Sequence, residues 1–474
     1  MLVRRVLSAL ALAPLVPAGH APAVSTASTA DARVTPSART PLTASAGPNF
    51  AQAAVARTAD GTQHVVWVVD NADRTHNYEH TAISPSGVQG PVHRIPASNW
   101  GQLSTPVDLG VNADGSLRLA FRGSLDGNTA NFFTYKGVYT AVSGDGGATW
   151  AVPREVLTKS ISDGGVTMAY VPDGTGRPIT GYGDTGGFHW NVGLVPEASV
   201  ETATVQEFTD HDAMGASLVT SGGGVYVVYQ STRANGIFAR QVWPTLGGPL
   251  QAPGTYTNPG QPMALVDRPG VGPVAAYAIN GKVVLWDIGA NATHAVPGMD
   301  GPNNVALAVL PDGHLWVAAQ GPIGYTPRVS RVAARGWNVD RRPVVLDELY
   351  STFGIEVSSA GALRAELLLT GNEVAEPSRI HAMSALAQLT VKASPRRWRV
   401  GRDQRVVFKV TDVDGAVAGR EGARRRQALH HGRLREVQHP VPRLQPAEDD
   451  HGQGEEDELL HRQDDPEDQA LISP

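Results

Sequence analysis

The chain has 474 residues, 41% of them hydrophobic and 18% charged, so it is long and apolar enough to bury a large core. A formal net charge of -6 gives no electrostatic case for a nucleic-acid partner, and the lack of cysteine excludes disulfides, thiolate metal sites and cysteine nucleophiles. The 52 glycines and 34 prolines separate short apolar runs rich in Val, Ala, Leu and Tyr. This pattern favours an all-β fold over a helical one.

Residues 1–23 have the pattern of a secretory signal peptide: two arginines, an apolar run, and Ala-Pro-Ala as a small-residue cleavage site. The apolar run is shorter than the roughly 20 residues that span a bilayer, and no other segment is predicted to cross a membrane. Residues 24–48 consist mostly of Ala, Ser, Thr and Pro, which predicts a disordered spacer. We therefore expect a secreted protein.

From residue 49 onward the sequence repeats one unit, an apolar strand that turns into a second apolar strand. Gly61 and Gly361 mark the first and last turns, and the 300 residues between them span six intervals with a mean of about 50 residues, close to the roughly 40–50 residues of a propeller blade. Asp-Gly between alternating apolar runs is a strong hairpin signal. The seven strand pairs are Ala51–Val55 with His64–Val69, Val107–Val111 with Leu117–Phe121, Thr167–Val171 with Pro178–Tyr182, Ala216–Val219 with Val225–Tyr229, Met263–Val266 with Val274–Tyr277, Ala306–Leu310 with Leu315–Ala319, and Ile355–Val357 with Leu363–Leu369.

This period predicts a β-propeller over residues 49–386. A series of β-sandwiches lacks so regular a long period, and a parallel β-helix repeats at roughly 20 residues or fewer. Either six or seven blades close the ring, and one repeat split between the two chain ends would lock it.

One turn within the repeat carries a more specific signal, the stretch from Ser143 to Trp150. Asp145 can accept hydrogen bonds from nearby backbone N–H groups, the paired glycines can adopt positive φ, and Trp150 can pack beneath the loop. With Ser143, Asp145, Gly147 and Trp150 at its defining positions, the stretch resembles the Ser-x-Asp-x-Gly-x-x-Trp Asp box, the BNR repeat of sialidase-like β-propellers. In that family the motif lies on the blade periphery, so the resemblance implies a fold rather than a catalytic residue.

The resemblance also implies where to look for an active site. Sialidases combine an arginine triad, an Asp acid/base and a Tyr nucleophile activated by a Glu. Arg94 begins an Arg-Ile-Pro motif, Arg122 follows an apolar strand, and Tyr350 has Glu348 two residues before it. Two of these signals also have a structural interpretation. Arg94 can be part of the outer strand of the first blade, because several residues separate it from the next inner strand. Tyr350 can be a packing residue, with Glu348 an acidic residue of a surface loop.

Other polar and aromatic residues are weaker candidates. His211 between two aspartates could form a metal or acid/base cluster, but nothing at ligand spacing accompanies it, so an interblade loop is the alternative. Several aromatic side chains could stack on sugar rings or could fill the spaces between blades, namely Tyr78, Trp100, Tyr135, His189 and Trp190. No cofactor is expected, and calcium has no recognisable ion-loop spacing to support it.

After residue 386 the sequence changes character. Residues 387–419 contain two alternating strands and a turn, and they resemble the opening of a bacterial Ig-like module. Residues 420–474 are charged and without strand periodicity, so they cannot complete a sandwich. We interpret them as an out-of-frame translation, because codon degeneracy admits a strand-like reading one base later. A natural disordered acidic tail is the alternative, and resequencing the locus would decide between the two.

Together these features predict a secreted bacterial protein that engages extracellular glycans or polysaccharides, either as a binding module or as a diverged glycosidase. An active exo-α-sialidase and a non-catalytic adhesion or structural protein of the cell surface are the alternatives. The incomplete arginine motif favours binding.

Overall fold

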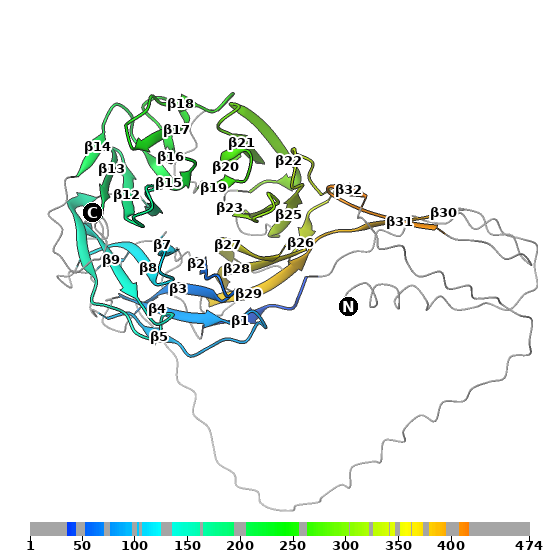
Figure 1. The fold of residues 1–474 in the computed structure, drawn as a ribbon, viewed down its shortest axis with the longest axis horizontal. Coiled ribbons are helices and arrows are strands. Elements are labelled where there is room, and N and C mark those ends of the chain that lie inside the picture. The colour runs from blue at the N-terminus through cyan, green and yellow to red at the C-terminus, as the bar shows by residue number, and fades with distance from the viewer. Residues whose placement is uncertain are drawn as a thin grey trace, which may run out of the picture. The chain divides into compact units, whose positions relative to one another are not determined.

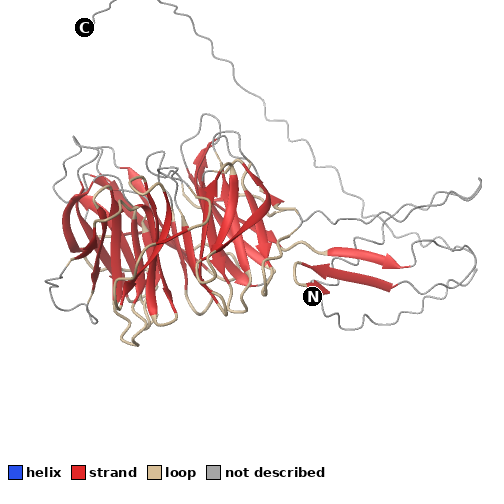
Figure 2. Ribbon diagram, turned by 90° about the horizontal axis from the view of Figure 1, so that it is seen from above, coloured by secondary structure: helices blue, strands red, loops and turns tan. Residues whose placement is uncertain are grey.

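The computed structural model of the chain describes sixteen stretches of sequence. They are residues 36–43, 53–70, 76–96, 102–103, 107–124, 135–161, 165–193, 205–255, 263–302, 304–321, 326–340, 342–346, 351–361, 363–372, 379–394 and 407–416. Every regular element within them is a β-strand (Figures 1 and 2). The prediction of an all-β fold is therefore confirmed.

Seven antiparallel sheets surround a central axis as the blades of a propeller, and each blade has four strands that succeed one another from the axis outward (Figure 1). Blade 1 consists of β2 (Ala54–Arg57), β3 (Gln63–Asp70), β4 (His76–Ile83) and β5 (His93–Arg94), and blade 2 of β7 (Asp108–Val111), β8 (Leu117–Ser124), β9 (Tyr135–Ser143) and β10 (Arg154–Ile161). Blade 3 consists of β11 (Val166–Tyr170), β12 (Pro178–Asp184), β13 (Gly187–Val192) and β14 (Gln206–Phe208), and blade 4 of β15 (Met214–Ser221), β16 (Gly224–Ser231), β17 (Gly236–Trp243) and β18 (Leu250–Gln251). Blade 5 consists of β19 (Ala264–Arg268), β20 (Gly272–Ile279), β21 (Lys282–Asp287) and β22 (Ala292–Asp300), and blade 6 of β23 (Asn304–Val309), β24 (Leu315–Gln320), β25 (Arg328–Val332) and β26 (Val344–Val345). Blade 7 consists of β27 (Ser351–Gly361), β28 (Arg364–Asn372), β29 (Arg379–Leu386) and β1 (Thr40–Pro41). A short extra strand, β6 (Gln102–Leu103), also pairs with β8.

The seven strand pairs expected from the sequence are the first and second strands of the seven blades. The choice left open between six and seven blades is thereby decided in favour of seven. The second strands are the most deeply buried, because the flanking blades cover both of their faces, and this burial explains why they are nearly continuous apolar runs. The period of about 50 residues was therefore a reliable guide to the architecture.

The ring is closed by a strand from the other end of the chain. β1 pairs antiparallel with β29, and Leu42 N–H donates to the Ile380 carbonyl at 2.8 Å. These N-terminal residues lie in the stretch 24–48 that composition assigned to a disordered spacer. That assignment is wrong for residues 36–43, which composition could not reveal because β1 is only two residues long and depends on a long-range partner.

Side chains strengthen the same closure between blades 1 and 7. Arg57 on β2 forms an ion pair with Glu366 on β28 and donates to the Ser358 hydroxyl at 2.9 Å. Gln63 on β3 also donates to Ser358, at 3.0 Å. The first and last blades are thus joined by polar contacts as well as by β1.

Beyond the propeller, a three-stranded sheet of β30 (Thr390–Ser394), β31 (Val407–Asp412) and β32 (Gly415–Ala416) is described. These strands occupy the stretch expected to open an Ig-like module, but a complete sandwich is not seen in the described residues. The tail 420–474 and the signal segment 1–23 lie outside them. No helix in the described stretches is long and apolar enough to cross a membrane.

Candidate functional site

The turn from Ser143 to Trp150 joins β9 to β10 on the outer half of blade 2. Ser143 Oγ donates to Asp145 Oδ1 at 2.8 Å and accepts the N–H of Gly147 at 2.8 Å. The backbone N–H and hydroxyl of Thr149 donate to the two carboxylate oxygens of Asp145 at 2.9 and 2.6 Å. Trp150 Nε1 donates to the Gly147 carbonyl at 3.2 Å, which fixes the indole beneath the loop. The turn is thus held by its own side chains.

The electrostatics of this turn are those of a structural element. Hydrogen bonds from the hydroxyl and N–H of Thr149, and then from Ser143, lower the pKa of Asp145 to about 2. A carboxylate with so low a pKa stays ionised at neutral pH and is a poor proton donor. Because the turn also belongs to the outer hairpin of its blade, away from the axis, we assign it no catalytic role.

The turn packs against the neighbouring blade through a histidine. The ring of His80 on β4 of blade 1 lies so close to Gly147 that a Cβ at that glycine would be 1.9 Å from His80 Cε1. His80 contacts Trp150 edge to face, with ring centroids 5.6 Å apart, and its Nε2 lies 3.1 Å from His64 Nδ1. Burial lowers the pKa of His80 to about 4 and also lowers the pKa of His64. Both imidazoles are therefore neutral at pH 7.

The two arginine candidates lie on different blades. Arg94 is on β5, the outermost strand of blade 1, and is exposed. Burial raises the pKa of Glu79 on the adjacent strand, and the positive charge of Arg94 opposes that rise. Arg122 is on β8, the second strand of blade 2, and is only 4% exposed. Arg94 thus lies on the outer strand of blade 1, as its structural interpretation predicts, whereas Arg122 is buried in the ring. Glu348 and Tyr350 lie outside the described residues.

A carboxyl beside the axis was not singled out from the sequence. Asp108 is the first residue of β7, the innermost strand of blade 2 (Figure 1). Its Oδ2 accepts the N–H of Met168 on β11 of the next blade at 2.7 Å. Burial nevertheless raises its pKa to about 6, because desolvation outweighs the hydrogen bonds from Met168, Thr167 and Leu109. The signal that could have found it is a charged residue within a predicted innermost strand, Val107–Val111.

The triplet around His211 forms no common site. Arg240 donates to Asp210 at 2.7 Å, His211 Nδ1 lies 3.0 Å from the Tyr229 hydroxyl, and Asp212 accepts the N–H of Arg233 at 2.9 Å. The three side chains lie in the loop before β15 and thus have separate partners in blade 4. Within the described stretches, no group of three or more His, Cys, Asp or Glu residues is arranged to hold a metal ion.

The described aromatic candidates fill spaces within and between blades. Tyr78 is buried and packs edge to face on Phe121 of blade 2, with centroids 4.7 Å apart. His189 and Trp190 are buried in blade 3, where Trp190 stacks on Phe188 at 5.6 Å. Trp100 and the side chain of Tyr135 lie outside the described residues. The first three are therefore packing residues and are not positioned to stack on a sugar.

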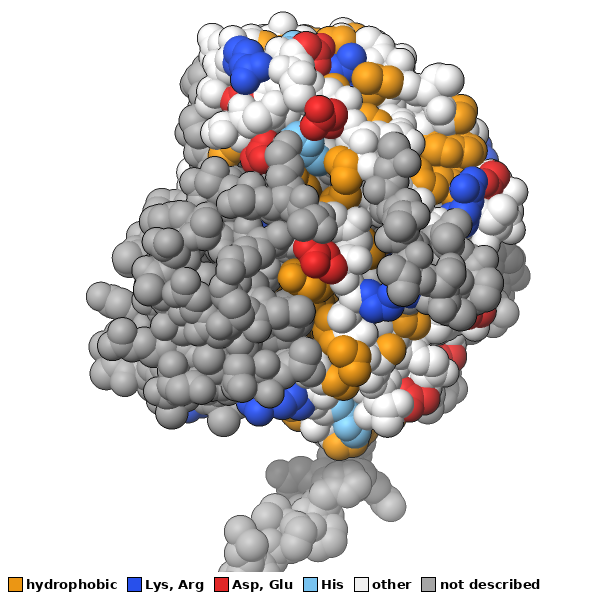
Figure 3. All heavy atoms as spheres, turned by 90° about the vertical axis from the view of Figure 1, so that its left-hand side faces the viewer, with side chains coloured by type: hydrophobic (Ala, Val, Ile, Leu, Met, Phe, Trp, Pro, Cys, Tyr) orange, Lys and Arg blue, Asp and Glu red, His pale blue; other side chains and the backbone are white. Residues whose placement is uncertain are grey.

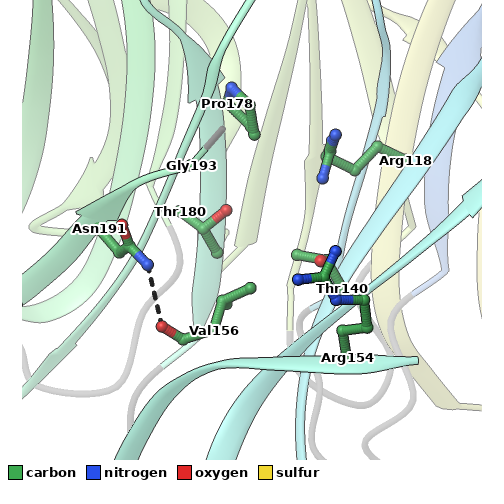
Figure 4. Close-up of a pocket in the computed structure, with 8 residues that line it drawn as sticks. All are labelled: Arg118, Thr140, Arg154, Val156, Pro178, Thr180, Asn191 and Gly193. Atoms are coloured by element: carbon green, nitrogen blue, oxygen red, sulfur yellow. Dashed lines mark hydrogen bonds between the residues drawn. The ribbon is translucent and has the colours of Figure 1, made fainter. Parts of the chain in front are cut away.

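A small polar cleft lies between blades 2 and 3 (Figure 4). Arg118, Thr140 and Arg154 come from blade 2, and Thr180 and Asn191 face them from blade 3. Asn191 Nδ2 donates to the Val156 carbonyl at 3.0 Å and bridges the two blades. The cleft has a free volume of about 10 Å³, which is room for about one water molecule. It is therefore too small to accept a sugar ring.

Among the described residues on the flank that Figure 3 shows, no large patch carries charges of one sign only. Acidic and basic side chains of the described residues are interspersed there with apolar ones. This distribution agrees with the small net charge of the chain.

Comparison with solved structures finds proteins of distantly similar structure. A protein of unknown function from Dyadobacter fermentans matches with a TM-score of 0.42 and 11% identity, over 73% of this chain and 99% of that one. An α-L-arabinofuranosidase from Fusarium graminearum matches with a TM-score of 0.43 and 11% identity, over 75% and 96% of the two chains. The NanB sialidase of Streptococcus pneumoniae matches with a TM-score of 0.39 and 9% identity, over 73% and 69%.

Searches by sequence gave a different outcome. No model of a known protein family matches this sequence, and no curated protein matches it. The Asp-box and Ig-like assignments therefore stay predictions.

Proposed function

We propose that this chain is a secreted propeller protein that engages glycans or polysaccharides outside the cell, and that it does so by binding. The observation that carries the proposal is the braced turn from Ser143 to Trp150 on an outer hairpin of a seven-bladed ring, because its residues resemble the Asp box of sialidase-like propellers. The signal-like residues 1–23 support export.

The placement of the arginines supports binding over sialoside hydrolysis. A sialidase-like site needs several guanidinium groups that converge on the substrate carboxylate at the axis. Arg94 lies on an outer strand, and Arg122 is buried within a sheet. A glycan-binding role needs no such cluster, since amide and aromatic side chains suffice for it.

A second candidate function, glycoside hydrolysis, is supported by Asp108. A carboxyl with a pKa of about 6 can remain protonated near neutral pH and donate its proton to a leaving oxygen. The ionised Asp108 carboxylate also lowers the stability of the fold at pH 7, because its desolvation outweighs its hydrogen bonds. Groups with strongly shifted pKa values of this kind are common at functional sites.

The two functions separate in one set of experiments on the full chain. We expect purified protein to bind members of a glycan panel while leaving fluorogenic sialosides and other aryl glycosides intact. Measurable hydrolysis that Asp108→Asn lowers by about 100-fold or more, without loss of glycan binding, would establish the second candidate. The matched control is Asp267→Asn, since Asp267 also lies on an innermost strand and accepts a hydrogen bond from a neighbouring blade, from Ser221 of blade 4 at 2.6 Å. A protein that shows no glycan binding and no hydrolysis would overturn both proposals.

A further inference from the structure

The turn between β31 and β32 makes specific contacts with blade 6, about 80 to 100 residues earlier in the chain. Arg331 Nη2 donates to Asp412 Oδ2 at 2.9 Å. Asp414 accepts the N–H of Ala334 at 2.8 Å through Oδ1, and its Oδ2 lies 2.5 Å from His314 Nε2. Val413, between the two aspartates, is buried. A guanidinium, an imidazole and a backbone N–H thus face two carboxylates that are two residues apart.

The blade 6 side of this contact is organised by its own neighbours. Asp340 accepts the N–H of Arg331 at 3.1 Å, and Asp312 Oδ1 lies 3.0 Å from His314 Nδ1. Arg268 of blade 5 donates from Nε to the Gly313 carbonyl at 2.9 Å, and its guanidinium stacks over Trp337 at 4.7 Å. The segments that carry the three donors are therefore held in place by contacts that do not involve β31 or β32.

Burial makes this contact more than a surface ion pair. Arg331 is 1% exposed, and a buried guanidinium that loses a carboxylate pays a desolvation cost that an exposed one does not. The turn itself is stabilised locally, because Asp412 Oδ1 accepts the N–H of Asp414 at 2.9 Å and Gly415 adopts a φ of +107°. Both partners are thus preorganised, which lowers the entropic cost of joining them.

We propose that His314, Arg331 and the Ala334 N–H form a binding surface for an acidic turn, and that its occupant is the Asp412–Gly415 turn of this same chain. The contact acts as a latch that ties the strands β30–β32 to blade 6. The segment after the propeller is then coupled to the ring through paired charges, in addition to the covalent connection through residues 387–389.

The test is hydrogen exchange, followed by mass spectrometry, on the full chain carrying Asp412→Asn and Asp414→Asn together. We expect amide exchange over residues 407–416 to become at least tenfold faster, and protection of the Ala334 amide to be lost. The matched control is Asp173→Asn, which removes a carboxylate from a turn of blade 3 that accepts the N–H of Thr175 in the same local manner. That variant should leave exchange over 407–416 unchanged.

Two further observations keep the proposal falsifiable. Exchange over β24, the second strand of blade 6, reports whether the double variant still folds, and if it does not, Asp414→Asn alone decides the question. His314→Gln tests the same contact from the propeller side and should also accelerate exchange over 407–416. Unchanged exchange there in folded variants would overturn the latch.

Discussion

Replacing Gly147 by alanine should lower the free energy of unfolding by about 2–5 kcal/mol. Gly147 has a φ of +90°, a conformation that costs an L-residue roughly 1–2 kcal/mol. The added Cβ would also lie 1.9 Å from Cε1 and 2.3 Å from Nδ1 of the buried His80 ring, so the turn or blade 1 must move. Overpacking of this kind adds about 1–3 kcal/mol. Chemical denaturation of the variant and of the natural chain measures the sum.

The adjacent glycine provides the control. Gly146 also has a positive φ, +70°, but a Cβ there would meet nothing closer than His64 Cε1 at 3.9 Å. Gly146→Ala should therefore cost only the backbone strain, roughly 1–2 kcal/mol. The difference between the two variants isolates the contact between the turn and blade 1. Equal losses for the two would show that the turn does not pack on His80 as described.

This contact also shows which features of the fold the sequence could predict. The braced turn depends on residues within eight positions of one another, and the hairpins depend on Asp-Gly or Gly turns between apolar runs. Local chemistry therefore predicted both of them correctly. The docking of Gly147 on His80 joins positions 67 residues apart, and no local pattern indicates which blade face will meet a turn. β1 was missed for the same reason, because a two-residue strand has no periodicity.

The candidate site was less predictable than the fold. Arg94 and Arg122 were selected by a short motif and by a strand end, and neither signal says whether a side chain faces the axis, a sheet interior or solvent. Asp108 stood within a correctly predicted inner strand, yet its raised pKa depends on burial against β11 of the next blade. Electrostatic perturbation of this kind arises from packing, which periodicity locates only coarsely.

The second large effect is a pH dependence centred on the same blade interface. The pKa of His80 is about 4 in the folded chain, against 6.5 for an ordinary histidine. Between these two values the unfolded chain binds more protons than the folded one, so the His80 contribution to stability is complete above pH 6.5 and is lost as the pH falls toward 4. The shift corresponds to about 3 kcal/mol. Lowering the pH from 7 to 4 should therefore weaken the contact between His80 and the turn.

The pH profile of the natural chain alone does not isolate this effect. Asp108 and Asp340 each have a folded pKa raised to about 6 by burial, against 3.8 for an ordinary aspartate. Between these values the folded chain binds more protons, so both groups stabilise the fold as the pH falls from 6 to about 4 and oppose the effect of His80. A nearly flat profile is thus compatible with large individual contributions.

The variant His80→Gln isolates the contribution of His80 to stability. Asp108 and Asp340 are present in both proteins, so their contributions cancel when the free energy of unfolding of the variant is subtracted from that of the natural chain. At pH 7 the variant should be less stable than the natural chain, since it loses the ring contact with Trp150. Between pH 7 and pH 4 that difference should shrink by about 3 kcal/mol, because glutamine does not titrate in this range and the histidine does. Denaturant unfolding at half-unit pH steps measures it. Parallel stability curves for the two proteins would mean that His80 titrates normally and that its ring is not enclosed by the braced turn.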